Sequence, residues 1–293
     1  MKKFIYGSCI ILLLAACNNK NRSSDAYGNF EATEIIVSAQ HGGQILWLNV
    51  DEGSTLKADE QIGLIDTSDL YLQKQLFIAQ KTAVQAQYPI LKAQADVQRQ
   101  QFTNLEKDFN RIKNMLKDGA TTQKQYDDIE GGMAIAKRQI AAIESQQAAL
   151  HSQQQTIDKQ IAQVENTIKK CKIVNPQEGT VLVKYAETGE TTAPTKAIYK
   201  IGNLAEMKLK IYVSETQLSS IKIGQKVSML IDSKNKNLET LEGEIAWISD
   251  KAEFTPKIIQ TREERVNLVY AVKVAVKNDG RLKIGMPAEV NFQ

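Results

Sequence analysis

Cysteine, histidine and proline are scarce in this sequence, whose 293 residues include three cysteines, two histidines and five prolines. The few prolines and the 42% hydrophobic content exclude a disordered chain. Because His41 and His151 are the only histidines, we expect Cys171 to be a small apolar helix residue and not a nucleophile. We predict no catalytic, cofactor-binding or metal-binding residue.

The N-terminus lacks an apolar run long enough to cross a bilayer. The run from Phe4 to Leu14 is shorter than the about 20 residues that a transmembrane helix needs. Lys2 and Lys3 precede it, so the segment has the pattern of a secretory signal.

The quartet LAAC, Leu14 to Cys17, resembles the bacterial lipobox. The resemblance implies a signal peptide over residues 1–16, whose removal leaves Cys17 as a lipidated first residue. The small polar residues of 17–25 then predict a flexible tether. Cys171 becomes the only free thiol, so no disulfide framework is possible. The alternative is a plain signal peptide with an incidental cysteine.

An excess of charge of either sign is also lacking. The chain has 37 basic and 34 acidic residues, and loss of the two signal lysines leaves 35 basic residues and a net charge near +1. This balance predicts no binding to nucleic acid.

What the sequence does contain is an imperfect internal repeat. Residues 42–66 and 178–202 align without a gap, with matching glycines and with apolar residues alternating with polar ones. This pattern is typical of half-buried strands joined by tight turns, and neither copy could bury its apolar face alone. It resembles the two halves of a biotinyl/lipoyl-type β-sandwich, which we assign to residues 41–66 and 173–202.

In lipoyl carriers a modifiable lysine lies on the hairpin that joins these halves. Here residues 67–172 take that position, which argues against a carrier function and a bound cofactor. The insertion is rich in Ala, Gln, Lys and Leu, which favour helices. Thr67, Ser68 and Asp69 are N-cap candidates at its start.

Apolar residues follow a narrow 3,4 spacing on both arms of the insertion. On the return arm they fill twelve of fourteen positions, and Gln147 and Gln154 are the exceptions. The twelve are Tyr126, Ile129, Met133, Ala136, Ile140, Ile143, Leu150, Ile157, Ile161, Val164, Ile168 and Cys171. The outgoing arm has Leu91, Ala95, Phe102, Leu105, Phe109, Ile112 and Leu116 in phase. The pattern predicts a two-stranded coiled coil whose arms, each about fifty residues long, project about 75 Å.

Three local features modify this hairpin. Pro89 removes one helical hydrogen bond and predicts a helix break near Tyr88. Asp118, Gly119 and Ala120 predict the turn between the arms. The exposed small residues Ala141, Ala142, Ala148 and Ala149 would let hairpins pack side by side, although alanine also serves ordinary helix propensity.

The third unit, residues 203–293 together with 26–40, has the pattern of a small β-barrel. Met207–Val213 alternates as a strand does, Ser214–Gln217 has capping-box spacing, and residues 266–276 alternate again. Short strands with glycine turns and one short helix fit such a barrel. The opening strand has no other partner and is expected to join it. The predicted fold class is therefore α+β: a split lipoyl-like sandwich, an inserted helical hairpin and a barrel.

This nesting resembles that of the HlyD-family periplasmic adaptors, also called membrane fusion proteins, over almost the whole mature chain. Adaptors that dock on TolC-like channels carry a motif at the hairpin tip. It consists of an Arg, a Leu four residues later and a Ser seven residues after the Leu, and a Tyr-Asp pair commonly follows. The same spacing here gives Arg111, Met115 and Thr122, then Tyr126 and Asp127. The resemblance implies that Arg111, Met115 and Thr122 contact such a channel. From the residues alone, Arg111 could lie on a solvated face and Thr122 could N-cap the second arm.

Residues 252–290 resemble a signature of the YbhG-like branch of these adaptors, whose members work with ABC-type exporters. Within it, Phe254 to Glu264 has the pattern of a surface loop, and the resemblance implies a transporter contact there.

The resemblance implies a non-enzymatic adaptor that forms a homo-oligomer, a hexamer, and joins an inner-membrane ABC-type exporter to a TolC-like outer-membrane channel. The chain would be periplasmic, with Cys17 holding it by lipid to the inner membrane. Two alternatives stay open: a lipoyl or biotin carrier component of an enzyme complex, and a lipoprotein that spaces the envelope without transport.

Overall fold

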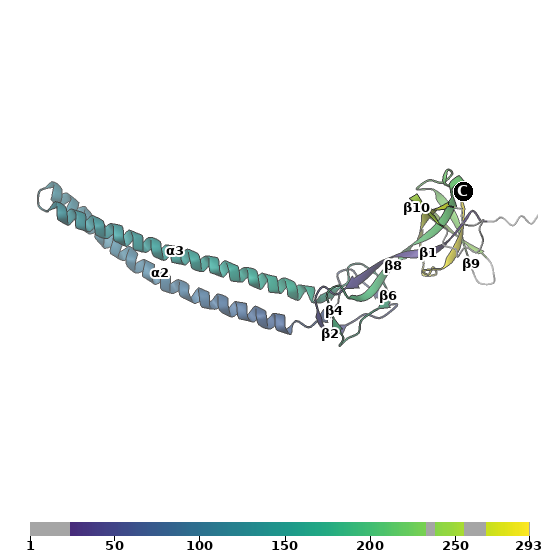
Figure 1. Cartoon of the computed structure of the whole chain (residues 1–293), viewed down its shortest axis with the longest axis horizontal. Coiled ribbons are helices and arrows are strands. Elements are labelled where there is room, and N and C mark those ends of the chain that lie inside the picture. Colours follow the sequence, from purple (N-terminus) through teal and green to yellow (C-terminus); the bar gives the residue numbers. More distant parts are fainter. Residues whose placement is uncertain (1–23, 233–237, 255–267, 293) are drawn as a thin grey trace, which may run out of the picture.

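The computed structural model describes residues 24–232, 238–254 and 268–292 and shows an elongated molecule (Figure 1). A helical hairpin forms one end, a β-sandwich lies in the middle and a β-barrel forms the other end. The α+β fold class predicted from the sequence is confirmed.

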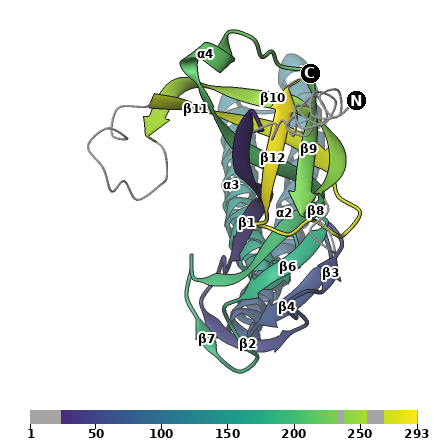
Figure 2. The same ribbon diagram turned by 90° about the vertical axis from the view of Figure 1, so that its right-hand side faces the viewer.

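The sandwich combines strands from both copies of the repeat (Figure 2). One sheet has the order β5 (Lys172–Val174), β4 (Gln61–Ile65), β2 (Gly43–Leu48) and β7 (Thr191–Thr192). The other strands are β3 (Thr55–Leu56), β6 (Gly179–Lys184) and the adjoining parts of β1 (Ala26–Ser38) and β8 (Ala197–Ser214). Because β2 pairs with β7 and β3 with β6, each copy covers the apolar face of the other, and Ile45, Ile65, Ile198 and Ile201 share one core.

The barrel is closed. Its strands follow the order β1, β12 (Pro287–Phe292), β9 (Lys226–Asp232), β10 (Leu238–Phe254), β11 (Leu268–Lys277) and β8, and pairing of β8 with β1 completes the circle. Alternate residues of these strands, among them Leu209, Ile211, Val272 and Val274, are fully buried in its core. The short helix α4 (Glu215–Leu218) begins with the predicted capping box, formed by Ser214 and Gln217.

Strands β1 and β8 run through both β-units. Residues 27–31 of β1 pair with β8 in the barrel, and residues 33–38 pair with it in the sandwich. The expectation that the opening strand joins the barrel alone is therefore incomplete, because this strand has partners in both units. Ile35 and Val37 pack against the sandwich core. The predicted boundary after residue 202 falls inside β8, and the domain limits stay predictions.

The hairpin consists of α2 (Ser68–Lys117) and α3 (Gln123–Lys170). All fourteen positions of the 3,4 spacing on the return arm are buried or half-buried, including Gln147 and Gln154, and so form the seam of a coiled coil. Three ion pairs also join the arms: Lys74 to Glu165 at 2.7 Å, Lys81 to Asp158 at 2.7 Å and Arg99 to Glu144 at 3.0 Å.

Helix α2 is continuous across Pro89, so the predicted break near Tyr88 is wrong. A proline inside a helix costs about 3 kcal/mol. Packing against α3 on both sides of Pro89 favours the helical state of the whole 50-residue segment by more than that. The two helices curve together along their length (Figure 1).

The start of α2 differs from the expectation as well. Thr67 occupies the N-cap position, but its side chain makes no capping hydrogen bond. The carboxylate of Asp66 accepts hydrogen bonds from the Ser68 hydroxyl at 2.6 Å and the Ser68 amide at 2.9 Å. These bonds hold the pKa of Asp66 below its ordinary value. Asp66, the residue just before the three predicted candidates, is thus the side chain that accepts hydrogen bonds at the start of α2.

Candidate functional site at the hairpin tip

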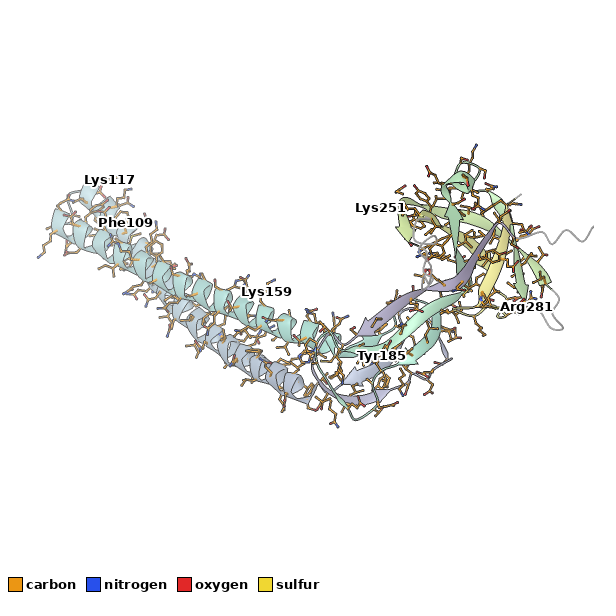
Figure 3. All side chains as sticks on the ribbon, turned by 45° about the vertical axis from the view of Figure 1, so that its right-hand side comes forward. Phe109, Lys117, Lys159, Tyr185, Lys251 and Arg281 are labelled. Atoms are coloured by element: carbon orange, nitrogen blue, oxygen red, sulfur yellow. The ribbon has the colours of Figure 1, made fainter. Side chains whose placement is uncertain are left out.

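The predicted turn closes the hairpin at the end farthest from the β-units, next to Lys117 in Figure 3. The amide of Gly119 donates to the Leu116 carbonyl at 3.1 Å, and the amide of Ala120 donates to the Met115 carbonyl at 2.8 Å. These two bonds form a Schellman motif. Gly119 has φ +69, in the left-handed region that favours glycine.

Thr122 is the N-cap of α3. Its hydroxyl oxygen accepts a hydrogen bond from the Gln125 amide at 3.3 Å, and the Gln125 side chain accepts one from the Thr122 amide at 3.3 Å. The capping role considered for Thr122 is therefore confirmed. Sequence reasoning missed Gln125, although the T-x-x-Q spacing is the signal of a capping box.

Arg111 and Met115 lie one turn apart on α2. The Arg111 side chain is 72% exposed, and its Nη2 lies 3.6 Å from a carboxylate oxygen of Asp108. Met115 is 37% exposed. The tip therefore presents to solvent a guanidinium whose long ion pair leaves most of its donors free, with an apolar side chain beside it.

An aromatic pair joins the two arms below the turn. The rings of Phe109 and Tyr126 lie 5.1 Å apart between centroids, and Lys113 Nζ lies 5.9 Å from the Phe109 centroid. Asp127, the other member of the Tyr-Asp pair, accepts a hydrogen bond of 2.7 Å from Gln123. Tyr126 thus positions α3 against α2, while Asp127 bonds within the first turn of α3.

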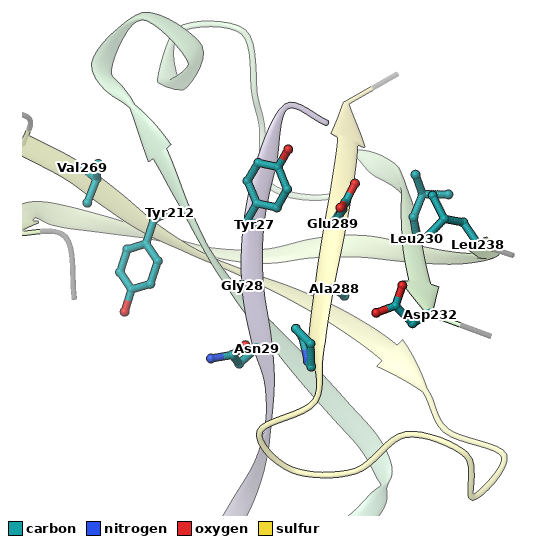
Figure 4. Close-up of a pocket in the computed structure, with 11 residues that line it drawn as sticks. Tyr27, Gly28, Asn29, Tyr212, Leu230, Asp232, Leu238, Val269, Ala288 and Glu289 are labelled. Atoms are coloured by element: carbon teal, nitrogen blue, oxygen red, sulfur yellow. The ribbon is translucent and has the colours of Figure 1, made fainter. Parts of the chain in front are cut away.

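The barrel carries a depression of about 520 Å³ around β1 and β12 (Figure 4). The side chains of Tyr27 and Glu289 project side by side from these two strands, whereas that of Tyr212 points in a different direction. Tyr27 is 54% exposed, and Glu289 accepts a hydrogen bond from Ser24. The lining therefore offers no convergent set of polar groups that would fix one ligand.

Cys171 is fully buried at the end of α3, inside the sandwich core. Its thiol donates to the Thr167 carbonyl at 3.4 Å, and burial raises its pKa. Cys171, the C-cap of α3, is thus packed as a small apolar residue, as the sequence indicates.

Three predicted features lie outside the described residues: the signal peptide, Cys17 with most of the tether, and residues 255–264 of the loop implied to contact a transporter. Within the part of the chain that the structure describes, no helix is both long and apolar enough to span a membrane. Over the same residues, no group of His, Cys, Asp and Glu is arranged to hold a metal ion.

Comparison with known proteins gives consistent likenesses in sequence. The LcnD-like, C-terminal domain family matches residues 203–277. The UPF0194 membrane protein YbhG of Salmonella arizonae is 26% identical, over 91% of this chain and 87% of its own length. A UPF0194 membrane protein of Yersinia enterocolitica is 24% identical over 99% of this chain and 98% of its own.

Solved structures share the fold. MacA from Actinobacillus actinomycetemcomitans superposes with a TM-score of 0.56 at 21% identity, covering 91% of this chain and 76% of MacA. The membrane fusion protein Spr0693 from Streptococcus pneumoniae R6 gives 0.54 at 16% identity, covering 91% and 97%.

A split sandwich with a long hairpin inserted and a barrel beyond it is thus the architecture of the membrane fusion proteins, and this chain has it. The resemblance to HlyD-family periplasmic adaptors is confirmed. The chain's relatives in sequence include YbhG-named membrane proteins, whose branch residues 252–290 resemble.

Proposed function

We propose that this protein is the adaptor subunit of a tripartite export system, which links an inner-membrane ABC-type transporter to a TolC-like outer-membrane channel. The observation that carries the proposal is the hairpin: two helices of 50 and 48 residues rise from the sandwich and end in a tip with an exposed arginine. A helix of 50 residues is about 75 Å long, a length suited to reaching a partner across a gap.

In this proposal each part of the molecule has one task. Lipidated Cys17 holds the barrel near the inner membrane, and the sandwich and hairpin of several copies, six in the form the resemblance implies, enclose a conduit. At the tip, Arg111 donates to carbonyl or carboxylate groups of the channel, and Met115 supplies an apolar contact. The Thr122 hydroxyl adds a polar contact beyond its capping bond. The transporter supplies the energy, so the chain itself performs no chemistry.

The decisive experiment is in-cell cross-linking from the tip. A Lys117→Cys variant in a Cys171→Ser background carries a thiol at the turn without altering the Schellman bonds or the Thr122 cap. We expect a short thiol-to-amine cross-linker to capture a TolC-like channel. Arg111→Glu should abolish this product. The matched charge change Lys107→Glu, one turn farther from the tip, should leave it.

Two other functions predict different results. A carrier protein would show a mass increase on a lysine near Asp66 or Ile173, where the adaptor shows modification only at Cys17. An envelope spacer would change the periplasmic width on deletion and leave dye and antibiotic accumulation unchanged. If the Lys117→Cys variant captured only peptidoglycan, whatever the residue at position 111, the adaptor function would be contradicted.

A further inference from the structure

Helix α2 carries a second apolar row that its own hairpin does not bury. Its members each follow a seam residue by two positions: Leu72, Leu76, Ile90 and Val97, with alanine at the four positions between them (79, 83, 86 and 93). All eight are exposed, and the four large side chains are between 57% and 65% exposed. Two residues correspond to about 200° around a helix, so this row, the apolar edge, points away from α3.

Helix α3 has a complementary row at the same two-residue offset from its seam. We call this row, Ala142, Ser145, Ala149, Ser152 and Thr156, the small edge, and all five residues are exposed. The three hydroxyls each donate to the carbonyl four residues earlier, at 2.9 to 3.1 Å. Their polarity is therefore satisfied inside the helix, and another helix can approach without leaving a donor unpaired.

Neither edge carries a charged residue along these rows, although a solvated face of a long helix normally carries many. The apolar edge has large side chains where the small edge has none. Large residues of one edge can therefore fill the space above the small residues of the other, as knobs fill holes.

The upper part of the apolar edge, from Ala83 to Val97, lies at the same height along the hairpin as the small edge. The ion pairs of Lys81 with Asp158 and of Arg99 with Glu144 bracket this stretch, so Ile90 is level with the region around Ala149. In a closed ring every copy has the same height along the axis. The stretch from Ala83 to Val97 of one copy would therefore meet the small edge of the next copy without any axial shift.

We propose that the apolar edge of α2 packs against the small edge of α3 in a second copy of this chain, and that each copy uses both edges. The inference rests on the proposed adaptor function and adds to it the surface that joins neighbouring hairpins. The contact is heterologous, because different surfaces meet, so it does not end at an isolated pair; without an axial shift between copies it closes into a ring of hairpins.

The same geometry sets which face of the hairpin is inside the ring. A rotation of 200° in one direction equals 160° in the other, so neither edge points exactly away from the partner helix. Because the two helices are antiparallel, both edges are displaced toward the same face of the hairpin. On that face Val97 and Ala142 line a common groove with Gln94 and Gln139. The acidic partners of the three inter-helix ion pairs lie one residue after seam positions, on the other face. The ring therefore curves toward the glutamine face, and uncharged amides line its lumen.

The contact ends before the tip. Beyond Val97 the row continues with polar residues at the same spacing, Gln100, Asn104, Lys107, Arg111 and Asn114. Lateral packing thus lies in the middle of the hairpin and ends at Val97. The upper half stays free of its neighbours, which leaves Arg111 accessible.

Cross-linking between copies tests the surface. Full-length Ile90→Cys and Ala149→Cys chains, both in a Cys171→Ser background, are expressed together and treated with a short bis-maleimide. We expect a cross-linked heterodimer from the mixture and no cross-linked product from either chain alone. A chain that carries both cysteines should give a ladder of cross-linked oligomers. A dimer from Ile90→Cys alone would mean that two α2 edges meet, and it would overturn the proposal, as would the absence of any product from the mixture.

Charge substitutions separate loss of contact from loss of folding. For this test the cysteine pair is moved to positions 97 and 142. Ile90→Lys and Ala149→Glu should each reduce the yield of cross-linked oligomers at least tenfold. Combining the two should restore it, because the new charges face each other. Asn104→Glu, on the polar continuation of the row, should leave the ladder unchanged. Failure of rescue together with normal folding would overturn the assignment of partners.

A labelling experiment tests the inward face. Gln87→Cys on the glutamine face should lose reactivity toward a bulky polymer maleimide when the oligomer forms, whereas Gln85→Cys on the opposite face should keep it. The reverse order would overturn the proposed curvature. These readouts do not depend on export, so loss of the channel cross-link with an intact ladder would refute the function and leave the surface standing.

Discussion

The hydroxyl of Tyr199 donates a hydrogen bond of 2.8 Å to Asn175 Oδ1 in the centre of the sandwich. Asn175 Nδ2 donates in turn to the carbonyls of Lys57 and Gln177, at 2.7 and 2.6 Å. Both residues are fully buried, and burial raises the pKa of Tyr199 well above its ordinary value. The Asn175 side chain thus ties the loop at Lys57, in the first copy of the repeat, to Tyr199 in the second.

Tyr199→Phe removes a donor and leaves Asn175 Oδ1 buried without it. We expect the free energy of unfolding to fall by about 1–2 kcal/mol, the usual cost of an unsatisfied buried acceptor. Urea denaturation followed by circular dichroism measures the change. Tyr185→Phe on the exposed face of the same unit is the control and should change nothing measurable. An equal loss in both variants would show that the buried bond contributes nothing.

Thr122 has two proposed roles, which substitutions can separate. Thr122→Ala should lower the stability of the tip by about 1 kcal/mol, since the capping bond is lost, whereas Thr122→Ser should not. Thr122→Asp keeps a good cap and replaces the hydroxyl by a charge. If the hydroxyl contacts a channel, Thr122→Asp lowers export at normal tip stability, as hydrogen exchange reports. Full export by Thr122→Asp would restrict the residue to capping.

Two glycines near the tip should respond to alanine with opposite signs. Gly119→Ala forces an alanine to φ +69 and should cost about 1 kcal/mol. Gly131 lies inside α3, and a Cβ there would meet nothing within 4 Å. Gly131→Ala should therefore stabilise the hairpin by up to about 1 kcal/mol. Thermal unfolding at 222 nm measures both. A destabilising Gly131→Ala would reveal a packing role for this glycine that the monomer does not show.

Pro89→Ala restores an amide hydrogen to the middle of α2. We expect higher stability of the hairpin by about 1–3 kcal/mol, because the helix is already continuous at this position. Spin labels at residues 75 and 110 would report a longer mean distance if the proline is what bends the arm. An unchanged distance would assign the curvature to packing between α2 and α3.

The ion pair between Lys74 and Glu165 makes the root of the hairpin sensitive to acid. A hydrogen bond from Lys74 and its charge hold the pKa of Glu165 below the ordinary 4.5. The carboxylate therefore stabilises the folded state above that value, and the contribution disappears as the pH falls through the lowered pKa. The melting temperature of Glu165→Gln should lie below that of the parent at pH 7 and equal it in acid. Lys74→Met should abolish the same pH dependence, and a difference independent of pH would contradict this account.

Much of this architecture follows from periodicity in the sequence. The seam from Tyr126 to Cys171 is predictable because a long two-helix hairpin depends almost wholly on local spacing and one neighbouring helix. The repeat halves are predictable because apolar alternation leaves each without a complete core. Pro89 misled the prediction, because its local cost is smaller than the packing of fifty residues. Asp66 was missed because its bond to Ser68 precedes the periodic segment.

The sequence by itself determined the order of the units, the seam of the hairpin, the glycine at its turn and the capping residue of α3, since each depends on residues close together in the chain. Only the tertiary structure decided that β1 and β8 run through both β-units, that Asn175 meets Tyr199, and that the rows at Ile90 and Ala149 face outward at one height. These relations join residues far apart in the chain, and their register is fixed by strand pairing and by packing across the whole molecule.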